Sequence, residues 1–335
     1  MLQKQSDSHA PYRDITTIGI PRALMYYRYK SLWTTFFKEL GLTVVVSDPS
    51  TRDLFEQGDA VSVDECCLAS KLYMGHVHNL LDKCDAIFCP SLVNVGRHRS
   101  FCTKFQALPD LIANTFYESN PRIVSCLVED VQEDWSLRNA FEDLAQQFGA
   151  SKKDAKRITK NALAAYNQAQ HAYCDAQKQK MNAVQARPAA KRPLTILVAA
   201  HPYVIHDSFI GGPVSDTLEE MGICTLYTDA VDSSKALHEA DRFSSTLPWI
   251  VNREIIGSIM MLHPHVDGII LVSAFPCGPD SMTNDAITRN ITGKPTLTLT
   301  VDAQSGTAGL ETRIESFVDI LRYQKEGGYF HGNHA

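Results

Sequence analysis

The sequence predicts an α/β protein with two doubly wound parallel sheets, of the Rossmann or flavodoxin-like kind, joined by a helical segment. Two observations predict it. Short apolar runs alternate with helical patterns over residues 15–128, and this alternation restarts at residue 194 after a stretch, 133–184, that is helical throughout. The 335 residues also exceed the length of one typical domain. We therefore expect an N-terminal α/β domain at 13–130, a helical bridge and linker at 131–192, and a C-terminal α/β domain at 193–328.

The strands and helices of the first half follow from hydrophobic periodicity. Short β-branched or apolar runs predict strands, and apolar residues that recur every three or four positions predict helices. From Tyr29 to Leu40 the apolar residues keep helical spacing, and Gly41 is a typical helix end. The expected strands or extended segments are Ile18–Ile20, Leu42–Ser47, Ala60–Val63, Ala86–Phe88 and Arg122–Val128. The expected helices are Tyr29–Leu40, a short one near Leu54, Cys67–Leu81 and Leu108–Phe116.

The second half repeats the pattern after the bridge. A charged stretch at 152–160 without strand signals predicts bridging helices, and 186–193, with two prolines, predicts a linker. The expected strands are Leu194–Ala200, Ile223–Thr228, Gly268–Ala274 and Thr296–Val301. The expected helices are Pro213–Met221, those from about Phe243 to Leu262, Ser281–Ile291 and Thr307–Tyr323. Ligands of such sheets bind outside the carboxyl ends of the strands, so two facing sheets predict a site in an interdomain cleft.

Composition excludes several classes of function. Thirty-two basic and thirty-eight acidic residues give a net charge of −6, and the basic residues form no patch that could follow a phosphate backbone, which argues against a nucleic-acid partner. The first residues lack the apolar core of a secretory signal. No segment has the apolar length that a membrane helix requires, so we expect no membrane partner and a cytoplasmic protein.

The nine cysteines are many for a cytoplasmic protein, where structural disulfides are rare. No C-x-x-C pair is present, so a metal site would have to be assembled from distant residues. Three cysteines lie at turns that precede helices rather than inside elements: Cys277, Cys67 and Cys102. Cys67 opens a helix, where the dipole favours a thiolate, and Cys102 and Cys277 are expected at the ligand-facing edge of a sheet. Cys66 is an open alternative to Cys67, and the other five are expected to pack as small apolar residues.

Several blocks resemble, in order, the acyl-CoA dehydratase activase-related family, relatives of the D-component of 2-hydroxyacyl-CoA dehydratases and of double-cubane cluster proteins. The blocks are Ile18–Leu24, Asp64–Lys71 running into Gly75–Val77, Phe101–Asp110, His201–Tyr203, Cys277–Ser281 and Gly309–Phe317. In one loop Ala69 stands where relatives usually carry proline, a change that removes no ligand.

The resemblance implies an oxygen-sensitive [4Fe–4S] cluster, single or paired as a double cubane, held by Cys67, Cys102 and Cys277. A four-iron cluster normally takes four thiolates, so three would leave one iron open to another ligand. The resemblance also implies electrons from a separate ATP-dependent activator, since this chain has no G-x-x-x-x-G-K-[ST] loop. A related or identical subunit as a partner in an oligomer is a further expectation.

Other polar residues beside these positions are candidates for supporting roles. A cationic Lys71 or His76 would stabilise an anionic cluster or transfer protons, and the alternative for both is an ordinary helix-face hydrogen bond. His201 and Tyr203 follow the first strand of the second half and would orient a ligand there. Asp280 is close enough behind Cys277 to cap the following helix.

We therefore expect an iron–sulfur protein that accepts low-potential electrons and acts in the reduction or dehydration of a small, CoA-linked or other, substrate. Two alternatives stay open. The chain would be a non-catalytic cluster-carrying subunit or accessory factor of a larger complex, or a cluster-free α/β protein that binds a small molecule.

Overall fold

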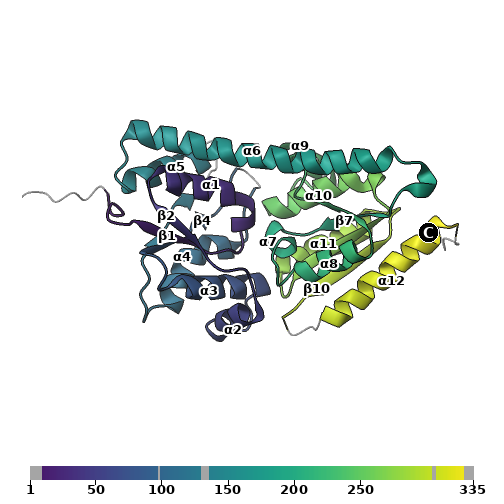
Figure 1. Ribbon diagram of the computed structural model, residues 1–335, viewed down its shortest axis with the longest axis horizontal. Helices are drawn as coiled ribbons and strands as arrows, with labels where there is room; N and C mark the ends of the chain where they lie inside the picture. Colours follow the sequence, from purple (N-terminus) through teal and green to yellow (C-terminus); the bar gives the residue numbers. More distant parts are fainter. Residues whose placement is uncertain (1–9, 97–98, 130–135, 304–306, 328–335) are drawn as a thin grey trace, which may run out of the picture. The chain divides into compact units, whose positions relative to one another are not determined.

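The computed structural model of the chain (Figure 1) describes residues 10–96, 99–129, 136–303 and 307–327. It contains two compact units, each described here by itself. The first comprises the residues up to His171 together with Thr246–Ile250. The second comprises Ala172–Ser245 together with the residues from Val251 onward.

The first unit is built on a parallel sheet with the strand order β2-β1-β3-β5. A separate parallel pair is formed by β4 and β6. The strands are β1 (Thr17–Ile20), β2 (Thr43–Val46), β3 (Ala86–Phe88), β4 (Ser91–Leu92), β5 (Ile123–Val124) and β6 (Leu127–Val128). The helices are α1 (Tyr26–Glu39), α2 (Arg52–Ala60), α3 (Leu68–Leu80), α4 (Thr103–Thr115) and α5 (Ser136–Gln147), followed by the start of α6 (Lys152–Gln185).

An aromatic cluster forms the core between α1, β3 and α5. The rings of Phe37 and Phe88 meet edge to face with centroids 4.9 Å apart, and those of Phe36 and Phe141 meet likewise at 4.8 Å. All four side chains are fully buried. Rings in this geometry stabilise a core beyond their buried area. The apolar spacing of α1 therefore fixes which face of the helix covers the sheet.

Helices α2 and α3 cross at two glycines. A Cβ built on Gly58 would lie 2.0 Å from the carbonyl oxygen of Lys71, and one built on Gly75 would lie 2.0 Å from the carbonyl oxygen of Leu54. Only glycine allows the two backbones to approach so closely. The extended segment predicted at Ala60–Val63 is wrong, because Ala60 ends α2 and Ser62 turns the chain back by donating from its N–H to the Asp59 carbonyl at 3.0 Å.

The second unit is built on a parallel sheet with the order β10-β9-β7-β8. Strands β9 (Gly268–Ala274) and β10 (Thr296–Val301) begin and end at the predicted residues; the others are β7 (Thr195–Ala199) and β8 (Cys224–Tyr227). The helices are α7 (Pro202–Ile205), α8 (Gly212–Glu220), α9 (Ser233–Phe243), α10 (Ile250–Leu262), α11 (Gly278–Asn290) and α12 (Thr307–Lys325), with short 3-10 turns at Ala189–Lys191 and His263–His265. Helices α8 and α12 pack against each other (Figure 1).

The last part of α6 completes the edge of this sheet. The buried Gln177 donates from Nε2 to the carbonyl oxygens of Tyr227 and Ala230, at 2.9 and 3.1 Å, and accepts from the Tyr227 N–H at 2.7 Å. Lys180 donates to the carbonyl oxygen of Thr225 at 2.8 Å. These side chains take the place of a further strand beside β8, so the edge carries fewer unsatisfied backbone groups.

Several predicted boundaries differ from the structure. The strand predicted at Arg122–Val128 is two short strands in different sheets, since β5 pairs with β3 and β6 with β4. Helix α4 begins at Thr103 rather than near Leu108 and contains Pro109, because its first turn is already closed by the Phe105 N–H and the Cys102 carbonyl at 2.9 Å. The sequence pattern did not predict α7 or α9.

The α/β class and the parallel sheets are confirmed. The three predicted segments, 13–130, 131–192 and 193–328, stay a prediction, as does the interdomain site. None of the helices in the described part of the chain combines the length and apolar character that a bilayer crossing requires.

Candidate functional site

The three cysteines predicted as ligands share one local geometry. Cys67, Cys102 and Cys277 are each the residue immediately before a helix, α3, α4 and α11 respectively. Each is partly exposed, and none uses its side chain to cap its own helix. The N–H groups of a first helical turn favour negative charge nearby, which favours the thiolate form of a cysteine at this position.

The topology places these helix starts at the ligand-binding edges of the sheets. Cys277 follows β9 after two residues, and α3 and α4 each lead back to a parallel strand, β3 and β5. A helix that connects parallel strands begins at the carboxyl edge of the sheet. Cys67 and Cys102 therefore lie at this edge in the first unit, and Cys277 lies at the corresponding edge in the second.

Cys67 and Cys102 are electrostatic neighbours within the first unit. Burial raises the pKa of the Cys67 thiol, and the nearby Cys102 acts in the same direction. The backbone of Ser70 and the Lys104 ammonium lower the pKa of Cys67. A cation and a helix N-terminus thus oppose the cost of forming two thiolates close together.

The remaining cysteines have packing roles in most cases. Cys89 and Cys126 are buried, and burial raises the pKa of each thiol to about 12. Cys224 begins β8 and is also buried, while Cys84 and Cys174 are partly exposed. Cys66 is buried, whereas Cys67 is partly exposed, so Cys67 is the more accessible of the adjacent pair.

Lys71 lies in α3 and is held by α2. Its Nζ atom lies 2.6 Å from Asp59 Oδ1, and the lysine side chain is largely buried. The hydrogen bond to the Asp59 carboxylate is the main reason that the pKa of Lys71 is raised. Lys71 therefore stays charged, and its charge is already paired with Asp59 across the crossing of the two helices.

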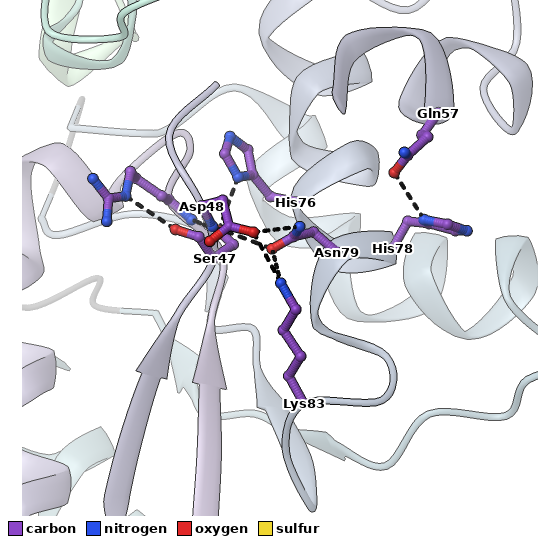
Figure 2. Close-up of polar contacts among 8 residues, drawn as sticks. Ser47, Asp48, Gln57, His76, His78, Asn79 and Lys83 are labelled. Carbon is purple, nitrogen blue, oxygen red and sulfur yellow. Dashed lines mark hydrogen bonds and ion pairs between the residues drawn. The ribbon is translucent and has the colours of Figure 1, made fainter. Parts of the chain in front are cut away.

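His76 is fully buried between Ser47 and Ser50. Its Nδ1 atom lies 2.8 Å from Ser47 Oγ (Figure 2). Its Nε2 atom lies 2.9 Å from Ser50 Oγ. Burial, reinforced by the charge of Arg22, lowers the pKa of His76 to about 3. The ring is therefore neutral near pH 7, donating at one nitrogen and accepting at the other. A neutral ring fits the alternative of ordinary hydrogen bonds, and a supporting role of His76 at a cluster stays a prediction.

The turn after β2 also carries a small charged network on its exposed side, which Figure 2 shows beside His76. Lys83 donates to Asp48 Oδ2 at 2.9 Å, and Asn79 donates to the same oxygen at 2.9 Å. These hydrogen bonds lower the pKa of Asp48. The Asp48 N–H donates to Asn79 Oδ1 at 3.1 Å, so the turn after β2 is fixed to α3.

In the second unit, His201 belongs to a buried polar network near the start of α11. His201 Nδ1 lies 2.6 Å from the Tyr203 hydroxyl, and Nε2 lies 3.3 Å from Asn252 Oδ1 and 3.4 Å from Asp280 Oδ1. Both groups that face Nε2 are acceptors, so this nitrogen carries the proton and Nδ1 accepts from Tyr203. Both ring nitrogens of His201 are thus already bonded within the protein.

Asp280 does not cap α11, contrary to the expectation from its position. It is buried, and Oδ1 accepts a hydrogen bond from Asn252 Nδ2 at 2.9 Å. The sequence analysis missed Asn252, which lies in an apolar helix 28 residues before Asp280. Asn252 is one of several polar residues in Ile250–Leu262, beside Arg253 and Glu254, so the sequence pattern did not single it out.

Within the described residues, no three His, Cys, Asp or Glu side chains are grouped so that they could hold a metal ion. The donor set of the first unit is two thiols, Cys67 and Cys102, at adjacent helix starts. This set suits a soft metal or an iron–sulfur cluster, and a third protein ligand would have to come from elsewhere.

Solved structures that resemble the chain do so only weakly. A periplasmic metal binding protein from Candidatus Liberibacter asiaticus has 12% identity and a TM-score of 0.27, covering 92% of this chain and 99% of that one. A sugar transporter from Clostridium phytofermentans has 10% identity and a TM-score of 0.19, covering 94% of each chain. No curated protein matches the chain.

Residues 17–231 match one protein family, described as the CoA enzyme activase uncharacterised domain. The match covers the whole sheet of the first unit, including Cys67 and Cys102, and continues through β8 of the second. The chain therefore belongs to the CoA enzyme activase uncharacterised domain family (DUF2229).

Proposed function

We propose that this chain is an iron–sulfur subunit related to the 2-hydroxyacyl-CoA dehydratases, with Cys67, Cys102 and Cys277 as ligands of a [4Fe–4S] or double-cubane cluster. It accepts low-potential electrons from a separate ATP-dependent activator and acts in the reduction or dehydration of a small, CoA-linked substrate. Membership in a family described as a CoA enzyme activase domain supports the link to this chemistry.

The observation that carries the proposal is the contrast among the cysteines. The three predicted ligands each precede a helix and are partly exposed, whereas Cys66, Cys89, Cys126 and Cys224 are buried. Packing alone gives no reason for three thiols to share this position. Ligation gives one, because a metal ligand must be accessible and deprotonated.

When bound, the cluster supplies one-electron transfer and an iron with an open coordination position. The residues of the chain have simpler roles. The N-terminal turns of α3, α4 and α11 stabilise the three thiolates, and Lys104 offsets part of the negative charge beside Cys67. The neutral His76 and the bonded His201 fix the loops and helix starts around them.

Anaerobic purification with iron and acid-labile sulfide analysis tests the proposal. Wild-type protein should contain iron and sulfide in equal amounts, with an electron paramagnetic resonance signal after reduction. Cys67→Ser, Cys102→Ser and Cys277→Ser should each lose most of the iron. Cys174→Ser is the matched control, because Cys174 is also partly exposed but lies within α6.

The results separate the alternatives. Equal, near-zero iron in wild type and Cys277→Ser would reject the proposal in favour of a cluster-free binding protein. Iron loss in Cys66→Ser but not in Cys67→Ser would show that Cys66, and not Cys67, is the ligand. A stable cluster with no turnover in the presence of activator and reductant would identify a cluster-carrying accessory subunit.

A further inference from the structure

The turn from β1 to α1 has a conformation that neither the strand nor the helix requires. Leu24, within this turn, adopts a left-handed backbone conformation with φ of 50°. A bulky residue seldom adopts it, because its side chain crowds its own backbone. Strain of this kind occurs preferentially where a turn contacts a ligand.

The same turn presents backbone N–H groups without acceptors. The left-handed Leu24 is followed by Met25 in the right-handed helical region, with φ of −71° and ψ of −1°. Two successive residues, one with a left-handed and one with a right-handed backbone conformation, direct their N–H groups to one side. They form a concave anion-binding arrangement called a nest. In the part of the chain that the structure describes, no acceptor is bonded to the N–H of Leu24 or Met25.

Arg22, two residues earlier, is held in a fixed position. Its backbone N–H donates to Ser47 Oγ at 2.7 Å, and its Nε donates to the carbonyl oxygen of Ser47 at 3.1 Å. Neither terminal nitrogen of the guanidinium has a partner among the described residues, and the side chain is partly exposed. Such an anchored guanidinium is preorganised to bind an oxyanion through both terminal nitrogens.

The surrounding charges favour an anion. Asp48 is close enough to Arg22 for the arginine to contribute to lowering the aspartate pKa, but its carboxylate is bonded by Lys83 and Asn79. Two cations, Arg22 and Lys83, therefore lie near one carboxylate, that of Asp48, which leaves a net positive charge among these three groups. The site also lies at the carboxyl end of β1, where parallel sheets bind their ligands.

We propose that Arg22 and the N–H groups of Leu24 and Met25 form a binding site for an oxyanion, a phosphate or carboxylate group of a small ligand. No part of this site includes a cysteine. It can therefore be tested in iron-free protein, and its failure would leave the cluster proposal unaffected.

Nuclear magnetic resonance of the full-length, isotope-labelled chain tests the site. The probes are sodium phosphate, sodium acetate and sodium chloride, added at constant ionic strength. We expect saturable shifts of the Leu24 and Met25 amide signals and of Arg22 Nε–H with phosphate. Acetate should act more weakly, and chloride should cause no saturable shift. Stronger binding of acetate would identify a carboxylate site instead of a phosphate site.

Amino-acid substitutions show how much Arg22 contributes to phosphate binding. Arg22→Gln should weaken phosphate binding by roughly tenfold, because it removes a charge-assisted pair of hydrogen bonds. Arg22→Lys should restore only part of the affinity, since it keeps the charge without the planar fork. Lys30→Gln removes one exposed positive charge from α1 and should leave the affinity unchanged.

Three results would overturn the proposal. The first is a chloride shift of the same signals that is as large as the phosphate shift. The second is a phosphate shift that does not saturate in the wild-type chain. The third is an Arg22→Gln variant that binds phosphate as tightly as wild type. The first two need no variant, so they hold even if an Arg22 substitution disturbs folding.

Discussion

Asn252 donates a hydrogen bond of 2.9 Å to the buried carboxylate of Asp280. The two residues are 2% and 4% exposed, and the second carboxylate oxygen, Oδ2, has no hydrogen-bond partner among the described residues. The Asn252 amide is thus a principal source of stabilisation for this carboxylate, next to the N–H of His201.

Asn252→Asp should therefore destabilise the second unit. It places a second carboxylate against Asp280 at nearly unchanged volume, at a cost of about 3 kcal/mol for an uncompensated buried charge. Exchanging both residues, in Asn252→Asp with Asp280→Asn, restores one amide and one carboxylate and should recover most of the stability. Urea denaturation midpoints measure both; a double variant as unstable as Asn252→Asp would contradict the pairing.

The buried, neutral His76 should make stability depend on pH. Its pKa is about 3 in the folded chain and 6.5 without the fold, so the unfolded state binds the extra proton between these values. The contribution is fully present above pH 6.5 and is lost as the pH falls toward 3, by on the order of 5 kcal/mol in total. Urea denaturation from pH 7 to 4 measures this loss. His76→Gln should flatten the dependence, while His78→Gln, on the exposed side of α3, should not.

Gly58→Ala should destabilise the first unit, because the new methyl group would meet the Lys71 carbonyl oxygen at 2.0 Å and the helices must separate. Overpacking of this kind costs about 1–3 kcal/mol. Gly309→Ala is the control, since a Cβ there has no atom within 4 Å, and it should be neutral or stabilise the chain slightly. Thermal unfolding of the two variants would show the difference, and equal midpoints would argue against the close crossing.

Gln177→Leu should destabilise the second unit by about 2–4 kcal/mol, because it removes three hydrogen bonds to Tyr227 and Ala230, at and just after the end of β8, and leaves backbone groups unsatisfied. Gln179→Leu makes the same change on the exposed face of α6 and should have little effect. Hydrogen exchange of the Tyr227 amide gives a local measurement. Unchanged protection of that amide in Gln177→Leu would mean that the side chain does not hold the strand edge.

Thiol alkylation of iron-free protein should separate the cysteines. Cys89 and Cys126 are buried with pKa values of about 12, so iodoacetamide at pH 8 should leave them unmodified while Cys102 reacts. In denaturant all nine should react. Peptide mass spectrometry after a short exposure to iodoacetamide measures the modification of each cysteine. Cys89 modified as fast as Cys102 would be inconsistent with the burial of Cys89 directly after β3.

The sequence alone determined the α/β class, most helices and the bounds of β9 and β10. These follow from local hydrophobic periodicity, which depends only on residues that are close in the sequence. Turn chemistry also located Cys67, Cys102 and Cys277 beside helix starts. It misjudged Ala60–Val63, because the packing of α2 against α3 through Gly58 and Gly75 outweighed the local β-branched signal.

Only the tertiary structure decided which polar groups meet. Arg22 is anchored by Ser47, 25 residues away, and His201 faces Asn252, 51 residues away. His76 is neutral because two serines and buried surroundings enclose it, whereas its position in the sequence left both a cation and an ordinary hydrogen bond open. Burial and hydrogen bonding set the charge of a group, and both depend on contacts between distant segments that no local pattern encodes.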